Sequence, residues 1–290
     1  MPLALILSSY VAADRVGGFA QSLVLAEAGV DPLLAPTVLF GRHPGHGAPG
    51  GQSLSPDLFQ SVLDGIAAQG LWPLTDLVLT GYFSDPDQVR AAAALIRTLR
   101  ETPAEGLTRR RRIVVDPVLG DTHKGLYVKP AVAEALASEL VPLADILTPN
   151  LFELAYLEGQ SVAHLMDGPE ALLETARALS QRTGAQVMVT SVPGETAQET
   201  GVLAVTSDGC RRFRHAASPR QWSGAGDLFS AALGVALIRG DGALAAAEQA
   251  TRVVAETVSC SEAWGSPVLS LVAMGPRLSR PAARLATDTL

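Results

Sequence analysis

Short apolar runs alternate with longer segments of helical periodicity along the chain. The apolar runs have strand length and end in turn residues, and they lie at 3–9, 31–37, 76–81, 112–117, 145–149, 186–191 and 201–207. Apolar residues recur at helical spacing in 17–28, 56–69, 86–100, 130–140, 150–157, 170–182, 224–239 and 242–259. This alternation predicts an α/β fold: a doubly wound, mostly parallel sheet with helices on both faces.

Two segments depart from this alternation. Residues 41–52, GRHPGHGAPGGQ, are rich in Gly and Pro and contain two histidines, so we expect a short mobile lid. Residues 269–290 have weak periodicity, and we expect this tail to be partly disordered. The rest contains neither a linker nor an internal repeat, so residues 1–268 are predicted to form a single domain.

Composition narrows the class of partner. The formal net charge is -7, which gives nucleic acid or an anionic membrane no general attraction, so a small-molecule partner is favoured. The basic run 109–112 directly precedes an apolar run, and we expect a solvated loop end. Cys210 and Cys260 have no paired spacing, so neither a disulfide framework nor a zinc cluster is indicated. Two cysteines without a disulfide framework fit a reducing cytoplasm, and the lack of an apolar run near the ~20 residues that span a bilayer predicts a soluble protein.

Polar or turn residues follow several predicted strands: Ser8-Ser9, Thr80-Gly81-Tyr82, Asp116-Pro117, Thr148-Pro149-Asn150 and Thr190-Ser191. In open α/β sheets the ligand crevice lies beyond the carboxyl ends of the strands, so these positions can converge on one site. Each pair taken alone also fits an ordinary helix cap or turn.

The run WSGAGDLFSAALG, 222–234, combines small residues, an aspartate and a helix-like pattern. Gly224 and Gly226 let backbone N–H groups turn toward an anion at a helix start. Asp227 beside such an anion site suits a general base that faces a substrate hydroxyl. A plain helix start with Asp227 complementing the dipole is the alternative. Neither a Walker A loop nor a G-x-G-x-x-G fingerprint after the first strand is present.

GAGDLFSA resembles the anion-hole signature of the ribokinase superfamily, and VVDPVLGDTHKGLYVKP with ADILTPNLFELAYLEG resembles its pyridoxal kinase branch. The motifs LILSSYV, LTGYFSD, VMVTS and GVLAVTSDG continue the match in the family's order. The resemblance implies ATP-dependent phosphorylation of the 5'-hydroxyl of pyridoxal, and of pyridoxine and pyridoxamine as further substrates. It also implies Mg²⁺, a monovalent cation such as K⁺, and a homodimer.

The resemblance assigns roles to individual residues. Asp227 would be the catalytic base, with the oxyanion hole formed by Gly224, Ala225 and Gly226. The vitamer pocket would be lined by Ser9, Val16, Phe40, His43 and Tyr82. The nucleotide and its cations would be bound by Asp116, Asp121, Tyr127, Thr148, Asn150, Glu153, Thr190 and Ser191, with Asp116, Asp121 and Glu153 around the metal. From the residues alone, Asn150 and Glu153 also fit a capping box.

Two other functions stay open. A hydroxymethylpyrimidine kinase of the same superfamily more often has cysteine at the catalytic turn, so Asp227 argues against it. A non-catalytic protein that binds the vitamer or pyridoxal phosphate is the other. Ala225, where the family has Thr or another small residue, and the lid sequence His43-Pro44 leave room for that function.

Overall fold

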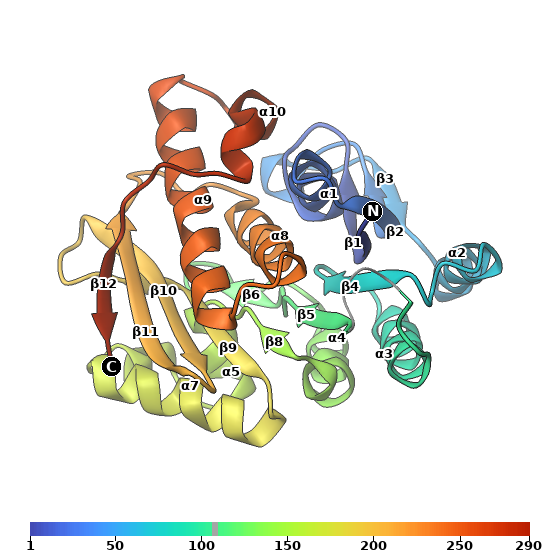
Figure 1. Cartoon of the computed structure of the whole chain (residues 1–290), viewed down its shortest axis with the longest axis horizontal. Helices are drawn as coiled ribbons and strands as arrows, with labels where there is room; N and C mark the ends of the chain where they lie inside the picture. The colour runs from blue at the N-terminus through green and yellow to red at the C-terminus, as the bar shows by residue number, and fades with distance from the viewer. Residues whose placement is uncertain (106–109) are drawn as a thin grey trace.

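The computed structural model describes residues 1–105 and 110–290. Within these ranges a ten-stranded sheet has the order β12-β11-β10-β9-β8-β5-β4-β1-β2-β3 (Figure 1). Its strands are β1 (Leu3–Val11), β2 (Asp31–Phe40), β3 (Gly51–Ser53), β4 (Thr75–Thr80), β5 (Arg112–Val115), β8 (Ile146–Leu147), β9 (Gln186–Pro193), β10 (Glu199–Thr206), β11 (Gly209–Ala216) and β12 (Ala286–Thr289). The strands from β2 to β9 in this order are parallel, whereas β3, β10, β11 and β12 run antiparallel to their neighbours.

Helices cover both faces of the sheet (Figure 1). One face carries α1 (Gly17–Glu27), α8 (Ala225–Ile238), α9 (Ala243–Ala263) and α10 (Leu271–Met274). The other carries α2 (Pro56–Ala68), α3 (Pro86–Glu101), α4 (Pro130–Ala135), α5 (Leu151–Leu157), α6 (Val162–Leu165) and α7 (Pro169–Thr183). Because strand side chains alternate, β1 sends Leu5 and Leu7 to the second layer and Ala4 and Ile6 to the first. The predicted doubly wound α/β fold is confirmed.

Local chemistry explains where the helices begin. Ser55 caps α2 by accepting a hydrogen bond from Leu58 N, and Asp85 caps α3 by accepting one from Asp87 N. A proline follows each cap, where its missing N–H is not needed. Helix α8 is apolar on almost every side because it lies between the sheet, α1 and α9. Among the described residues, no helix is both long and apolar enough to cross a membrane.

The antiparallel edge differs from the predicted pattern. Strand β11 was absent from the prediction because three of its residues are arginines and only Cys210 and Phe213 are buried. The tail that we expected to be partly disordered instead contains α10 and, at its end, β12, which pairs with β11. Two further short strands, β6 (Gly120–Asp121) and β7 (Gly125–Leu126), form a separate hairpin.

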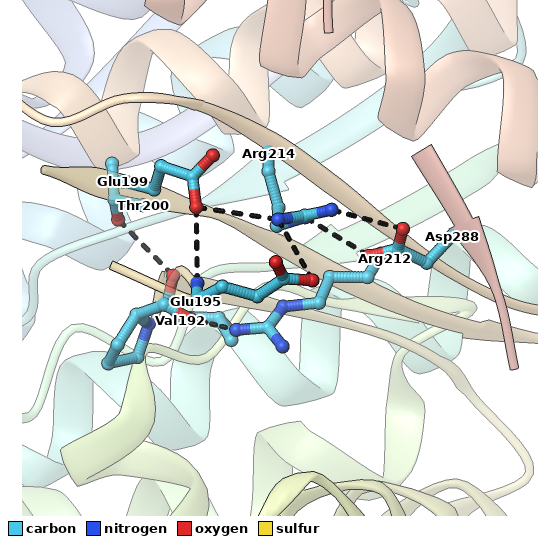
Figure 2. A network of polar contacts seen from close by, with 8 residues as sticks. Val192, Glu195, Glu199, Thr200, Arg212, Arg214 and Asp288 are labelled. Atoms are coloured by element: carbon cyan, nitrogen blue, oxygen red, sulfur yellow. Dashed lines mark hydrogen bonds and ion pairs between the residues drawn. The ribbon is translucent and has the colours of Figure 1, made fainter. Parts of the chain in front are cut away.

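Arg214 on β11 connects this edge to its surroundings (Figure 2). Its side chain is 11% exposed and lies 3.2 Å from a carboxylate oxygen of Glu195, 3.4 Å from Glu199 and 3.1 Å from Asp288. The neighbouring Arg212 donates to the carbonyl of Pro193. The arginines of β11, which make this strand unrecognisable in the hydrophobicity pattern, therefore hold β12 and the β9–β10 turn in place.

Within the basic run, Arg110 and Arg111 directly precede β5, and Arg112 is the first residue of that strand. Arg109 lies outside the described residues. Arg111 is half-buried and donates to the carbonyls of Thr75 (2.9 Å), Trp72 (2.7 Å) and Leu99. The expectation of a solvated run is wrong for Arg111, because backbone carbonyls at the end of α3 and before β4 need a donor.

Candidate active site

The carboxyl ends of four neighbouring strands meet at one edge of the sheet. Asp116 N donates to Thr80 O (3.4 Å), and Thr148 N donates to Val115 O (3.1 Å). Thr190 N continues the series by donating to Pro149 O (2.8 Å). The predicted polar strand ends of β4, β5, β8 and β9 are therefore adjacent, which is where ligands bind in open α/β sheets.

The turn before α8 approaches the loop after β1 closely. Gly224 caps α8 with φ +87°, and a Cβ atom there would lie 2.0 Å from the carbonyl oxygen of Arg15. Only glycine fits this position. The first intrahelical bond runs from Leu228 N to Gly224 O, so the amides of Gly226 and Asp227 precede it. The amide of Ala225 donates to Trp222 O at 3.3 Å. Amides at such a helix start can bind an anion.

Asp227 lies in the first turn of α8 and faces the loop after β1. Its Oδ2 accepts a hydrogen bond from Gly17 N at 2.8 Å. Burial raises the pKa of Asp227 to about 6, although the Gly17 hydrogen bond acts to lower it. The carboxyl group therefore exchanges its proton close to neutral pH while its orientation is fixed, as a general base requires.

Asp227 shares its surroundings with two buried acids. Asp116 is 6% exposed, and its pKa is raised by burial and by the charges of Glu153 and Asp227. Glu153 is 3% exposed, and burial raises its pKa to about 7. Negative charge on each of these carboxylates disfavours ionisation of the others, so a cation bound between them would be stabilised.

Asn150 and Glu153 form the capping box of α5. Asn150 Oδ1 accepts from Glu153 N (3.0 Å), and Glu153 Oε2 accepts from Asn150 N (2.8 Å). The other carboxylate oxygen of Glu153 accepts from Leu119 N (2.9 Å), and Asn150 Nδ2 donates to Gly120 O (2.8 Å). The capping interpretation of this pair is confirmed. Since both oxygens of Glu153 already accept amides, a bridging water suits a contact from Glu153 to a cation.

The third residue predicted around the metal, Asp121, lies on the β6–β7 hairpin. Its Oδ1 accepts from His123 N (2.9 Å) and Lys124 N (2.7 Å), which closes the turn. Among the described residues, one group of three His, Cys, Asp or Glu side chains brings its ligand atoms within 4.8 Å of one another, and that group lies at the lid. The ligand atoms of Asp116, Asp121 and Glu153 do not all lie within this distance of one another.

Three of the residues predicted to contact the vitamer belong to β1, to the loop after it and to β2: Ser9, Val16 and Phe40. Ser9 and Val16 are buried, and Ser9 packs on Gly17, where a Cβ atom would meet Ser9 Oγ at 2.0 Å. Phe40 O accepts from Ala12 N (2.9 Å), so the end of β2 lies beside the loop after β1.

Tyr82 and His43 complete the predicted pocket. Tyr82 follows β4, its carbonyl accepts from Thr37 Oγ1 (2.7 Å), and burial raises its pKa. His43 lies in the lid, and its pKa is lowered by burial, against the charge of Asp14, which acts to raise it. The His43 ring is therefore neutral at neutral pH.

Several residues predicted to contact the nucleotide lie at β8 and β9: Thr148 and Asn150 follow β8, and Thr190 and Ser191 belong to β9. The hydroxyl of Thr148 is buried without a hydrogen-bond partner among the described residues. Ser191, which follows Thr190, has φ 57° and is the one non-glycine residue with positive φ in the described ranges. Such strain concentrates at functional sites. Tyr127 is 46% exposed, yet its pKa is raised by burial of the hydroxyl and by the charge of Glu153.

Three residues near Asp227 were not among the predicted site residues. Gly17 supplies the amide described above, and behind it Gln21 Nε2 donates to Ser230 Oγ at 3.4 Å. Ser230 Oγ in turn donates to Asp227 O at 3.2 Å. In the sequence, the one indication of their role is that Gln21 and Ser230 are polar residues within otherwise apolar helical segments. A surface hollow lies elsewhere, and it is lined by residues 52–56, Leu58, Ser84, Asp85 and Lys129.

Comparisons with known proteins identify kinases of one family as relatives of this chain. The family described as phosphomethylpyrimidine kinase matches residues 90–270. Pyridoxal kinase PdxY of Deinococcus radiodurans is 31% identical over 284 residues, which cover 95% of this chain and 92% of the relative. The pyridoxine/pyridoxal/pyridoxamine kinase of Bordetella avium is 31% identical over 270 residues, which cover 92% of this chain and 88% of that protein.

A solved structure has the same fold over the full length. Pyridoxal kinase from Leishmania donovani, in complex with ADP and pyridoxamine, superimposes with a TM-score of 0.88 at 25% identity. The match covers 100% of both chains. The two proteins therefore share one fold over their full lengths.

Proposed function

Because this chain belongs to the pyridoxal kinase family, we propose that it transfers the γ-phosphoryl group of ATP to the 5'-hydroxyl of pyridoxal, and also of pyridoxine and pyridoxamine. One observation carries the proposal: the Asp227 carboxylate is held by Gly17 N at the start of α8, among amides suited to an anion. The names of the relatives supply the substrate class. The position of Asp227 at the start of α8 supports the proposal of a base beside a phosphate site.

Asp227 acts as the general base in the proposed reaction. With a pKa of about 6 it is ionised at neutral pH and can accept the hydroxyl proton. The hydroxyl oxygen then forms its bond to the γ-phosphorus as the bond to the bridging oxygen of ADP breaks. The amides of Gly224, Ala225 and Gly226 stabilise the charge on the transferring group; that of Ala225 must turn from its 3.3 Å contact with Trp222 O.

Mg²⁺ fits the acidic side of this site. Asp116 and Glu153 are buried carboxyl groups whose pKa values are raised by burial and by neighbouring carboxylates, so a cation beside them would stabilise their ionised forms. Bound Mg²⁺ neutralises phosphate charge and keeps part of its hydration shell. Asp116 would contact it most directly, Glu153 through water, and Asp121 from the hairpin. We include K⁺ as the monovalent cation, on the family resemblance.

The two substrates are proposed to enter from opposite sides of Asp227. On the vitamer side, Ser9 hydrogen-bonds the ring, Tyr82 and Phe40 offer flat faces, and Val16 and His43 close the pocket. The nucleotide phosphates extend toward β8 and β9, where the residues proposed to contact them are Tyr127, Thr148, Asn150, Thr190 and Ser191. The unpaired Thr148 hydroxyl and the strained Ser191 support this direction.

We propose that the protein acts in the cytoplasm as a homodimer, which the family resemblance supports. Both cysteines are free, as is usual in a reducing compartment. Light scattering coupled to size-exclusion chromatography tests the assembly: a mass near 60 kDa, twice that of the 30.2 kDa chain, supports the dimer. A mass equal to one chain contradicts it.

The test of the proposed function is a parallel assay of four alcohols. ADP formation is measured with ATP, Mg²⁺ and K⁺ against pyridoxal, pyridoxine, pyridoxamine and hydroxymethylpyrimidine, with loss of each alcohol followed by chromatography. Turnover of pyridoxal that Asp227→Asn removes supports the proposal. Preferred turnover of hydroxymethylpyrimidine instead supports the second candidate, a hydroxymethylpyrimidine kinase. Vitamer binding without ADP formation indicates a binding protein.

A further inference from the structure

Three side chains with metal-binding atoms meet outside the acidic cluster, where the lid crosses the loop after β1. Asp14 belongs to that loop, and His43 and His46 belong to the lid segment 41–52. One carboxylate oxygen and one ring nitrogen from each histidine lie within 4.8 Å of one another. Asp14 is buried, His43 is half-buried and His46 is exposed, so an ion can enter from solvent.

The spacing of Asp14 and His46 suits a shared metal ion better than a direct hydrogen bond. His46 Nε2 lies 3.5 Å from Asp14 Oδ2. A good N–H···O hydrogen bond is shorter, about 2.7–3.2 Å. Two ligand atoms that each lie about 2.1 Å from a tetrahedral zinc ion are separated by about 3.4 Å. The observed separation therefore matches that of two ligands on one such ion.

Backbone amides orient two of the three side chains. Arg15 N donates to Asp14 Oδ1 at 2.8 Å, which leaves Oδ2 facing His46. Gly45 N donates to Nδ1 of His43 at 3.1 Å, so this nitrogen has a lone pair that a metal ion can take over. The two imidazole rings are inclined by 64° with centroids 5.8 Å apart, so they are not stacked. The Arg15–Asp14 contact is the kind of outer contact that fixes ligand direction in metal sites, whereas a metal ion on His43 Nδ1 would replace the hydrogen bond from Gly45.

We propose that Asp14, His43 and His46 form a binding site for a transition-metal ion of the zinc type, completed by water. Imidazole nitrogen suits Zn²⁺, Cu²⁺ and Ni²⁺, whereas Mg²⁺ prefers oxygen ligands. The charge of Asp14 favours the ion, and Lys124, whose charge acts on His43, opposes it. A bound ion joins the lid to the loop that leads into Gly17, and so limits lid opening beside Asp227.

Calorimetric titration of the full chain with Zn²⁺, in excess Mg²⁺ that saturates oxygen-rich sites, tests this assignment. Co²⁺ absorption in parallel distinguishes imidazole coordination from an all-oxygen site. Asp14→Asn and His46→Gln each remove one ligand with little change in shape. His164→Gln is the matched control, because His164 on α6 is also exposed and also lies near an aspartate, Asp167, at 3.7 Å.

We expect the unmodified chain and His164→Gln to bind one Zn²⁺ ion with equal affinity. His46→Gln and Asp14→Asn should each weaken binding at least about tenfold, since loss of an outer contact alone has an effect of that size. Equal Zn²⁺ binding by all four proteins, or none by the unmodified chain, overturns the assignment. Thermal unfolding without metal verifies that each variant is folded, and His46→Gln decides alone should Asp14→Asn unfold, because His46 is exposed.

Discussion

Protonation of Asp227 is expected to switch off the proposed phosphoryl transfer within an accessible pH range. The pKa of this carboxyl is about 6, against an ordinary value of 3.8, because burial disfavours its charge. The Gly17 amide at 2.8 Å stabilises the ionised form but does not offset burial. A base of this kind is active only when ionised, so activity falls as the pH falls.

The expected size of the effect follows from the pKa. At pH 5 about one tenth of the Asp227 carboxyls are ionised, so kcat/KM for pyridoxal should be roughly a tenth of its plateau. If the pKa of Asp227 had its ordinary value of 3.8, the same tenfold loss of kcat/KM would appear only near about pH 3. Asp227→Asn, which keeps the acceptor for Gly17 N but not the base, should lower kcat/KM by about 10²–10⁴-fold at neutral pH.

The assay is the initial rate of ADP formation between about pH 4.5 and about pH 8, at saturating ATP and fixed free Mg²⁺. Glu153 also titrates in this range, with a pKa of about 7, so Glu153→Gln is measured in parallel and should keep the acid limb. A limb with its midpoint near pH 4, or an Asp227→Asn variant with near-normal kcat/KM, would refute the assignment of the base.

Further outcomes follow from the same contacts. Because the folded pKa of Asp227 exceeds the unfolded value, its ionised form lowers stability above about pH 6 and not below 3.8. Asp227→Asn should therefore raise the free energy of unfolding at pH 7.5 by at most about 3 kcal/mol, and leave it unchanged at pH 3.5, as thermal melts at the two pH values would measure. Gly224→Ala should abolish turnover and lower the free energy of unfolding by about 1–3 kcal/mol or more, because its Cβ atom would meet Arg15 O. Gly240→Ala is the control, since Gly240 also has positive φ, +95°, but has open space around it, and this variant should stay active. Equal loss of activity in both variants would contradict the steric argument. Glu153→Gln should raise the Mg²⁺ concentration for half-maximal rate at least about tenfold, and an unchanged Mg²⁺ titration would remove Glu153 from the cation site.

Much of the fold could be predicted because the central strands are continuous apolar runs. Parallel strands such as β1 and β4 are buried on both faces, and their sequences show it. Strand β11 was missed because its arginines are satisfied by partners far away in the sequence, such as Asp288. We expected partial disorder in residues 269–290 because their periodicity is weak, but the last residues pair with β11, which is far away in the sequence.

The candidate site was predictable only where its chemistry is local. The Gly224–Asp227 turn and the Asn150–Glu153 cap carry their residues within one helical turn, so the spacing alone indicates them. The amide of Gly17 has no side chain to signal its role, and it meets Asp227 only in the folded chain. The grouping of lid histidines with Asp14 has the same tertiary origin.

The hydrogen bond between Gly17 and Asp227 joins positions 210 residues apart. A ribosome releases the first of these positions long before the second, so a growing chain has no oriented base until its last third is made. The same separation makes the molecule suitable for division in the exposed turn at residues 195–198, between β9 and β10. Neither piece would be active alone, and recovered ADP formation on mixing would report their association.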